Sequence, residues 1–351
     1  MITNKLRWTI IRILRIFLKC QHRDPSKKNF KKIAYFIGGG IGDAIMAYPS
    51  LNLINKLWPD AELRIFVSYR KVKIISALFK NFCVYPLSPL LIFVIKYRIF
   101  NSCFDISFTN STAVFKFEIE LASFFTSKQT FGFRYPNEQI NYRLYSYSME
   151  FSENKHFSEQ NLLLISRFFL NKKNMAIPKL ETTFLDRDSE RKFIVIHPGF
   201  EKGYEKKGWP IDNYKEIILM LVKLNYNIVV LLGDTDIHLL SYFKNFKGVD
   251  ICIDPVPDDL IMLIKNTKLF LGNDSGPSHI ASFFGIPGIT LFGPVNPISS
   301  ASLGEHNSVI YTDPDCSPCH FFNVHCQDNR CMKSISVKRV WGEIEKKLNL
   351  K

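Results

Sequence analysis

The sequence has few acidic residues and no long hydrophobic run. Asp and Glu total 32 against 46 Lys and Arg, so the formal net charge of the 351 residues is +14. Such an excess predicts attraction to an anionic partner, whether nucleic acid, a phospholipid surface or a phosphorylated substrate. The apolar stretch 90–100 is interrupted by Lys96 and is too short to span a bilayer, so we expect no transmembrane segment.

A cleavable leader and low-complexity tracts are also lacking. The first residues contain no uninterrupted apolar core followed by small residues, which excludes a signal peptide. No Pro-, Ser- or Gln-rich tract indicates long disorder, whereas 46% hydrophobic and 14% aromatic residues can fill real cores. We therefore expect a globular protein in the reducing cytoplasm, where its eight cysteines are thiols or metal ligands.

The N-terminus, residues 1–30, carries basic residues at helical spacing. Lys5, Arg12, Arg15 and Lys19 recur in this way, with apolar residues around the rest of the helical wheel. The pattern predicts a basic amphipathic helix that lies in a membrane interface rather than crossing it. The alternative is a helix packed on the protein's own surface.

Short apolar runs alternate with helical patterns in two parts of the chain, residues 31–172 and 193–351. In the first part the runs begin at residues 33, 63 and 104, and in the second at 193, 227, 249, 268 and 288. This alternation predicts an α/β fold with two Rossmann-like, doubly wound domains facing a cleft. Residues 173–192 lose the periodicity and are predicted to be a linker. Ligands are expected at the carboxyl ends of the strands.

The glycine turn that follows the first apolar run reads "GGGIGDA" from residue 38. A dinucleotide fingerprint needs glycines at offsets of two and five, and no register supplies them, because Asp43 or Ile45 takes the last position. Asp43 can be a helix N-cap, since a carboxylate satisfies free backbone N–H groups there. That role does not exclude chemistry, and Gly40 and Gly42 would let a ligand approach the turn.

The segment "LGNDSGPSHIASFFGIPGITLFGP", from residue 271, predicts a strand that ends in a turn and then a helix. The helix start from Ser275 to His279 is a ready anion site, and Gly276 would let a phosphate come close to the backbone. His279 could donate to a phosphate oxygen or a ribose. A lone histidine is more often only a satisfied surface or core residue.

Two further strand ends carry polar residues. Around the turn at Gly199, the loop before Trp209 contains Lys202, Lys206 and Lys207, which are either solvated or clamped to an anion. Clamping would neutralise the charge of a diphosphate leaving group. Asp234 and Asp236 follow another strand in a spacing that holds a divalent metal in some enzymes. Without further ligands, we favour a role for Asp234 in binding base or ribose.

Residues 316–331 form a cysteine-rich segment. Cys316, Cys319, Cys326 and Cys331 lie within sixteen residues, with His320 and His325 between them. Such spacing can build a tetrahedral thiolate site, so a structural zinc or iron is one interpretation and free or oxidised thiols are the other.

Four motifs, in this order and spacing, resemble glycosyltransferase family 9, the lipopolysaccharide heptosyltransferases. They are "GIGDAIMAYPSL", "HPG" followed by "KKGWP", "LLGD", and "NDSGPSHIASFFGIPGITLFGPVNP". The resemblance runs from about residue 33 to the C-terminus and implies the GT-B arrangement of two Rossmann domains. It also implies that Asp43 is the general base and that Lys207 holds the donor diphosphate. Asp274, Gly276 and His279 match the family's nucleotide-binding residues.

The resemblance implies an inverting glycosyltransferase that needs no cofactor for catalysis. It would move heptose, or a related sugar, from an ADP-sugar to a lipopolysaccharide core or lipid A acceptor. The expected location is peripheral, on the cytoplasmic face of the inner membrane, at an anionic surface. Alternatives are a protein O-heptosyltransferase of the autotransporter-modifying type and a non-catalytic nucleotide-binding protein. Nucleic-acid binding is not expected, because no basic stripe with interleaved aromatics is found.

Overall fold

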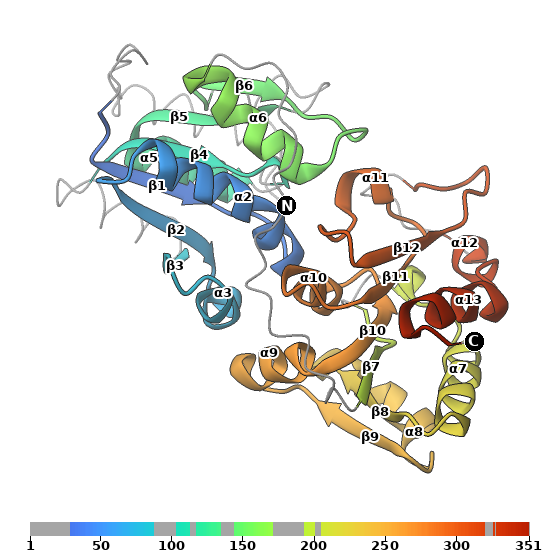
Figure 1. Cartoon of the computed structure of the whole chain (residues 1–351). Coiled ribbons are helices and arrows are strands. Elements are labelled where there is room, and N and C mark those ends of the chain that lie inside the picture. Colours follow the sequence, from blue (N-terminus) through green and yellow to red (C-terminus); the bar gives the residue numbers. More distant parts are fainter. Residues whose placement is uncertain are drawn as a thin grey trace. The chain divides into compact units, whose positions relative to one another are not determined.

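The computed structural model describes residues 29–87, 103–112, 117–134, 144–170, 193–200, 205–319, 326 and 328–350. The chain divides into two compact units, residues 1–177 and 178–351 (Figure 1). Nearly all of the predicted amphipathic helix, and the whole of the predicted linker at 173–192, lie outside the described residues.

The first unit is built on a six-stranded parallel sheet with the order β3-β2-β1-β4-β5-β6. The strands are β1 (Lys32–Phe36), β2 (Glu62–Ser68), β3 (Cys83–Leu87), β4 (Phe104–Thr109), β5 (Ser127–Arg134) and β6 (Tyr147–Glu150). The described helices are α2 (Ile41–Leu57), η1 (Tyr69–Lys71), α3 (Val72–Leu78), α5 (Phe117–Thr126) and α6 (Phe157–Phe169).

Aromatic side chains fill much of the first unit's core. The ring of Phe108 in β4 lies 5.2 Å from that of Phe131 and 6.2 Å from that of Tyr35, measured between centroids. Central strands of a parallel sheet are buried on both faces, which is why they are nearly continuous apolar runs. Each residue of β1 from Ile33 to Phe36 is accordingly at most 1% exposed.

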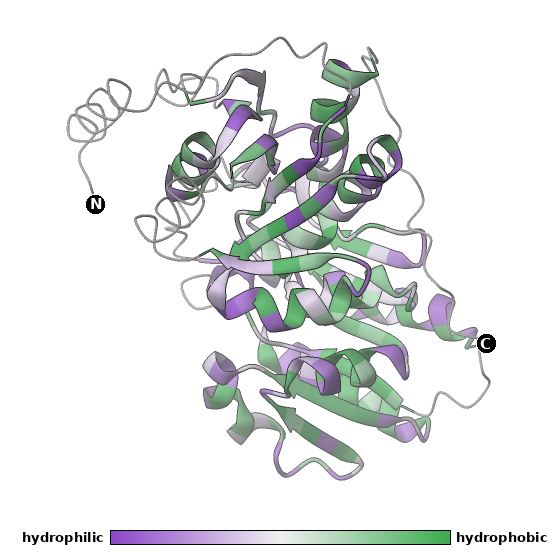
Figure 2. Cartoon of the chain, turned by 90° about the vertical axis from the view of Figure 1, so that its left-hand side faces the viewer, coloured by the Kyte–Doolittle hydropathy of each residue, from purple (hydrophilic) through white to green (hydrophobic). Residues whose placement is uncertain are grey.

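The second unit repeats this architecture with the strand order β12-β11-β10-β7-β8-β9. The strands are β7 (Phe193–His197), β8 (Asn227–Leu232), β9 (Val249–Ile253), β10 (Thr267–Asn273), β11 (Gly288–Phe292) and β12 (Asn307–Tyr311). The described helices are η5 (Glu205–Lys207), α7 (Ile211–Lys223), η6 (Asp234–Leu239), α8 (Leu240–Phe243), α9 (Pro257–Lys265), α10 (Gly276–Phe283), α11 (Pro297–Ser300), α12 (Arg330–Lys333) and α13 (Val337–Leu348). Figure 2 shows that the strands of both sheets are mainly hydrophobic, whereas the helices mix hydrophobic and hydrophilic residues.

Both sheets have the same doubly wound order. In each, the first strand of the unit pairs with the second on one side and with the fourth on the other. The strand order therefore reverses between β1 and β4 in the first unit, and between β7 and β10 in the second. Ligands of doubly wound sheets bind at the carboxyl ends of the strands at this switch point.

The α/β prediction is confirmed, and all eight predicted strands are present as β1, β2, β4 and β7 to β11. Four strands were not predicted, namely β3, β5, β6 and β12. Three of these lie at sheet edges, where strands are less apolar, and β6 falls in a polar stretch. β5 follows α5 without an intervening turn residue.

Among the described residues, no helix combines the length and apolar character that crossing a membrane requires.

Candidate active site

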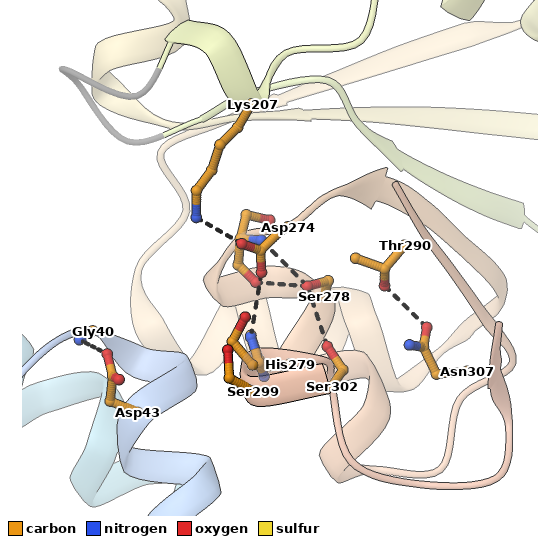
Figure 3. A network of polar contacts seen from close by, with 12 residues as sticks. Gly40, Asp43, Lys207, Asp274, Ser278, His279, Thr290, Ser299, Ser302 and Asn307 are labelled. Atoms are coloured by element: carbon orange, nitrogen blue, oxygen red, sulfur yellow. Dashed lines mark hydrogen bonds and ion pairs between the residues drawn. The ribbon is translucent and has the colours of Figure 1, made fainter. Parts of the chain in front are cut away.

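The glycine turn of the first unit is shaped around the carboxylate of Asp43. Gly39 has a φ of +86°, in the left-handed region, and a Cβ added to it would lie 2.0 Å from Asp43 Oδ2. The backbone N–H of Gly40, the N-cap of α2, donates to that same oxygen (Figure 3). Asp43 is thus the third residue of the helix rather than its N-cap, and Gly42 is buried in the same first turn.

The turn is held from the neighbouring strand by Asn110, which sequence reasoning missed. Asn110 follows β4 directly and is 1% exposed. Its Oδ1 accepts from the N–H of Gly38 at 2.8 Å, and its Nδ2 donates to the carbonyl of Gly38 at 3.2 Å. Thr112 Oγ1 donates to the same carbonyl. The side-chain amide therefore continues the β1–β4 pairing beyond the ends of the strands, and it fixes the turn that carries Asp43.

Asn273 holds the corresponding loop of the second unit. It is the last residue of β10 and is fully buried. Its Oδ1 accepts from the backbone N–H of Trp209 at 3.1 Å and from the hydroxyl of Tyr214 at 2.8 Å. Its Nδ2 donates to the carbonyls of Pro198 and Gly199 at 2.8 and 3.2 Å. One side chain thus connects the end of β7 with the start of α7.

The next residue, Asp274, joins Lys207 and His279. Lys207 Nζ donates to Asp274 Oδ2 at 2.6 Å, and His279 Nε2 lies 3.7 Å from Asp274 Oδ1. Figure 3 shows the three side chains converging from the end of η5, the end of β10 and the first turn of α10. Burial alone raises the pKa of a carboxyl, but the Lys207 ammonium and the contact with His279 lower that of Asp274 to about 2. A buried, ionised carboxylate therefore positions the ammonium beside the start of α10.

The start of α10 contains hydrogen-bonding groups without a partner among the described residues. They are Ser275 Oγ and His279 Nδ1, both buried. Gly276, the first residue of the helix, has no side chain to block an approaching ligand. Buried polar groups are normally satisfied, so this arrangement is typical of a site that receives a polar ligand. The N-terminal end of the helix favours an anionic one.

The two aspartates after β8 have different environments. Asp234 is exposed, and its carboxylate accepts from the N–H of Thr235. Asp236 is 3% exposed and accepts from the N–H groups of Gly233 and Phe200 at 3.0 and 3.2 Å. A Cβ on Gly199 would lie 2.0 Å from Asp236 Oδ2, so the position of the Asp236 carboxylate requires a glycine at residue 199. Asp236 thus ties two loops together, while Asp234 remains accessible.

The four cysteines of the 316–331 segment are free thiols in this structure. Burial, and then the neighbouring thiols, raise the pKa of Cys319 and bring that of Cys331 to about 11. Within the described residues, no group of three or more His, Cys, Asp or Glu side chains is arranged to hold a metal ion. His320 and His325 lie outside those residues, so the structural metal stays a prediction.

The predicted site residues form one group in each unit. Gly40, Gly42 and Asp43 lie together in the first. In the second, five predicted residues surround the start of α10, namely Lys207, Asp274, Ser275, Gly276 and His279. Asp234 lies apart from this group at the end of β8, and Gly199 lies in the loop that Asn273 holds. Lys202 is outside the described residues.

The fold defines the class of protein. Two doubly wound units of this order are the GT-B arrangement of glycosyltransferases, and solved structures share it. The E. coli ADP-heptose lipopolysaccharide heptosyltransferase II aligns with a TM-score of 0.71 at 17% identity, covering 91% of this chain and 98% of that one. The E. coli heptosyltransferase WaaC with ADP aligns with a TM-score of 0.67 at 14% identity, covering 90% and 99%.

The sequence comparisons give the family. The model of glycosyltransferase family 9, described as heptosyltransferase, matches residues 121–326, and the chain belongs to this family. Lipooligosaccharide heptosyltransferase 2 of Campylobacter jejuni is 22% identical over 331 residues, covering 91% of this chain and 98% of that protein. The chain is therefore a glycosyltransferase, and the resemblance seen in its motifs is confirmed.

Alanine at the two neighbouring glycines should have different effects on stability. Gly39→Ala forces a left-handed residue and a clash with Asp43, so we expect a loss of about 1 to 3 kcal/mol in the free energy of unfolding. A Cβ on Gly40 meets its nearest atoms at 3.6 and 3.8 Å, which are ordinary contacts. Gly40→Ala should therefore stay within about 0.5 kcal/mol of the wild type. Urea unfolding checks both, and equal losses would contradict this description of the turn.

The Asp274 ion pair predicts a pH-dependent stability. Because the pKa of Asp274 in the folded chain, about 2, lies below its ordinary value of 3.8, the ionised group stabilises the fold above about pH 4. That contribution is lost as the pH falls toward 2. Asp274→Asn should cost about 2 kcal/mol at pH 7 and about half of that at pH 3.

Urea unfolding of the second unit, followed by tryptophan fluorescence, measures this difference. Asp212→Asn is the matched control, because Asp212 also pairs with a lysine, Lys215, at 2.9 Å but has a side chain that is 88% exposed. It should change little at either pH. A cost for Asp274→Asn that does not depend on pH would show that the carboxylate is not ionised in the folded chain.

Proposed function

We propose that this chain is an inverting heptosyltransferase, with an ADP-sugar as donor and the inner core of lipopolysaccharide as acceptor. The observation that carries the proposal is the group at the start of α10. There the Lys207 ammonium lies near a helix N-terminus with two buried atoms, Ser275 Oγ and His279 Nδ1, that have no partner among the described residues. Membership of family 9, and the activities for which its relatives are named, supply the sugar and the acceptor.

The second unit would bind the donor. Lys207 would neutralise the charge that develops on the diphosphate as it leaves, and the helix start with Gly276 would receive its oxygens. His279 Nδ1 and Ser275 Oγ would donate to a phosphate or to the ribose. The exposed carboxylate of Asp234 would accept from ribose or base.

The first unit would supply the general base. Asp43 would take the proton from the acceptor hydroxyl while that oxygen attacks the anomeric carbon of the donor sugar. The bond from that carbon to the diphosphate oxygen breaks, and ADP leaves with the bonding electrons. Attack from the face opposite the leaving group inverts the configuration. Gly39 and Gly40, which add no side chains, keep the backbone around the carboxylate accessible.

The positive net charge supports this acceptor and a location at a membrane surface. The net charge of +14 suits an enzyme that works on a phosphorylated glycolipid in an anionic leaflet. We propose that the enzyme acts peripherally at the cytoplasmic face of that membrane. The predicted basic helix at the N-terminus, outside the described residues, would lie in the interface.

Removing the carboxylate of Asp43 should abolish most turnover without abolishing donor binding. With ADP-heptose, and acceptor lipopolysaccharide from a strain that lacks this gene, the wild type should release ADP. Asp43→Ala should release it about 10² to 10⁴ times more slowly. Asp60→Ala is the control, because Asp60 is an exposed acid just beyond the other end of α2.

Mass spectrometry of the acceptor identifies the product. If the wild type binds ADP-heptose but never turns it over, the chain is a nucleotide-binding protein and the proposal is wrong. If Asp43→Ala keeps wild-type turnover, the base is another residue. Transfer to protein but not to lipopolysaccharide would reassign the acceptor.

A further inference from the structure

Lys71 places an ammonium group at the glycine turn of the first unit. It is the last residue of η1, which follows β2 directly, and β2 pairs with β1 in parallel. The carboxyl ends of the two strands therefore meet, and the N–H of Ile37 donates to the carbonyl of Phe66 at 2.9 Å. From this position Lys71 Nζ donates to the carbonyl of Gly39 at 2.7 Å. The ammonium is thus fixed on the turn that carries Asp43.

The space over Gly40 is bordered by opposite charges. Among the described residues, the nearest heavy atoms to an added Cβ on Gly40 would be Asp43 Oδ2 at 3.6 Å and Lys71 Nζ at 3.8 Å. Neither distance is a clash, so a small group fits there. A group that approaches the backbone of Gly40 at this position therefore lies close to both the carboxylate and the ammonium.

The ammonium retains capacity for a ligand. A lysine has three N–H donors, and the carbonyl of Gly39 takes one of them. Within the described part of the chain, no carboxylate forms an ion pair with Lys71. Arg70 and Lys73 close by are exposed and add positive potential, which attracts anions over longer distances but does not orient them.

We propose that Lys71 binds an anionic substituent of the acceptor, a carboxylate or a phosphate, close to the hydroxyl from which Asp43 removes the proton. The proposal rests on the proposed function, because it takes Asp43 as the base. It makes the acceptor an acidic or phosphorylated sugar that is recognised at the reacting residue itself. A neutral sugar would bind in the same space without this anchor and would be a poor acceptor.

Replacement of the lysine by glutamine separates charge from structure. Lys71→Gln keeps an N–H donor for the carbonyl of Gly39 but loses the positive charge. At low ionic strength we expect the KM for acceptor to rise about 10- to 100-fold, with the KM for donor unchanged within about twofold. Lys71→Arg should restore most of the acceptor affinity. Lys73→Gln, which removes the same charge from the exposed first turn of α3, should change the acceptor KM less than about threefold.

Modified acceptors identify the anionic group. One preparation has its phosphates removed, and another has its carboxylates reduced to alcohols. On the acceptor that lacks the group bound by Lys71, wild type and Lys71→Gln should have nearly equal kcat/KM. The proposal is overturned if Lys71→Gln is no worse than Lys73→Gln, or if its penalty is the same on both modified acceptors.

A binding measurement keeps the test independent of turnover. If the wild type transfers no sugar at all, the proposed function fails, and the anion site is tested with inorganic phosphate and with glucuronate. A shift of the Gly40 amide resonance in the ¹⁵N–¹H spectrum, present in the wild type and lost in Lys71→Gln, supports the site. No shift with either anion overturns it.

Discussion

The buried carboxylate of Asp274 is the constraint on which the second unit's site depends. A charge in that position is tolerated only if it is paired, and its partners come from separate elements, η5 and α10. The contacts of Asp274 with Lys207 and His279 therefore connect three backbone segments, and they hold the Lys207 ammonium near the start of α10. Asn273, one residue earlier, uses all of its amide to hold the adjoining loops. Two consecutive residues at the end of one strand thus organise the loops around the start of α10.

In the first unit, too, a buried asparagine holds the loop after the first strand. Asn110 follows β4 as Asn273 ends β10, and both strands neighbour the first strand of their sheet at the switch point. Each asparagine binds backbone groups of the loop after that first strand. In the second unit, the group beside this loop contains the Lys207 ammonium, paired with Asp274, and two buried atoms, Ser275 Oγ and His279 Nδ1, that have no partner within the described part of the chain. In the first it leaves a carboxylate, Asp43, with the ammonium of Lys71 close by.

Much of this could be predicted from the sequence, because the informative residues are local. Apolar runs that end in turn residues predicted eight strands, and the pattern after β10 predicted the turn and the start of α10. Three of the four edge strands, β3, β6 and β12, were missed, because half-exposed strands have a weaker apolar signal. The prediction that Asp43 is the N-cap was also wrong, since Gly40 is the N-cap. An acid at the N-cap and an acid at the third helical position both favour a helix start, so the local sequence does not distinguish them.

The supporting contacts could not be predicted. Asn110 reaches a backbone group 72 residues away, and Lys71 one that is 32 residues away. No sequence pattern marks Asn110 or Lys71, because their side chains bind backbone groups, which every residue has. Likewise, the spacing of Asp234 and Asp236 could not reveal which is buried. The burial of Asp236 depends on Gly199, because a side chain there would clash with its carboxylate.

The central claim is that the two units divide the work, with anion binding in the second and the base in the first. Calorimetric titration of ADP into two variants, each checked for folding by circular dichroism, tests it most directly. Lys207→Met should weaken ADP binding about 10- to 100-fold, since a charge-assisted contact is lost. Asp43→Asn should bind ADP as the wild type does, within about twofold. Weaker binding in Asp43→Asn, or unchanged binding in Lys207→Met, would contradict this division.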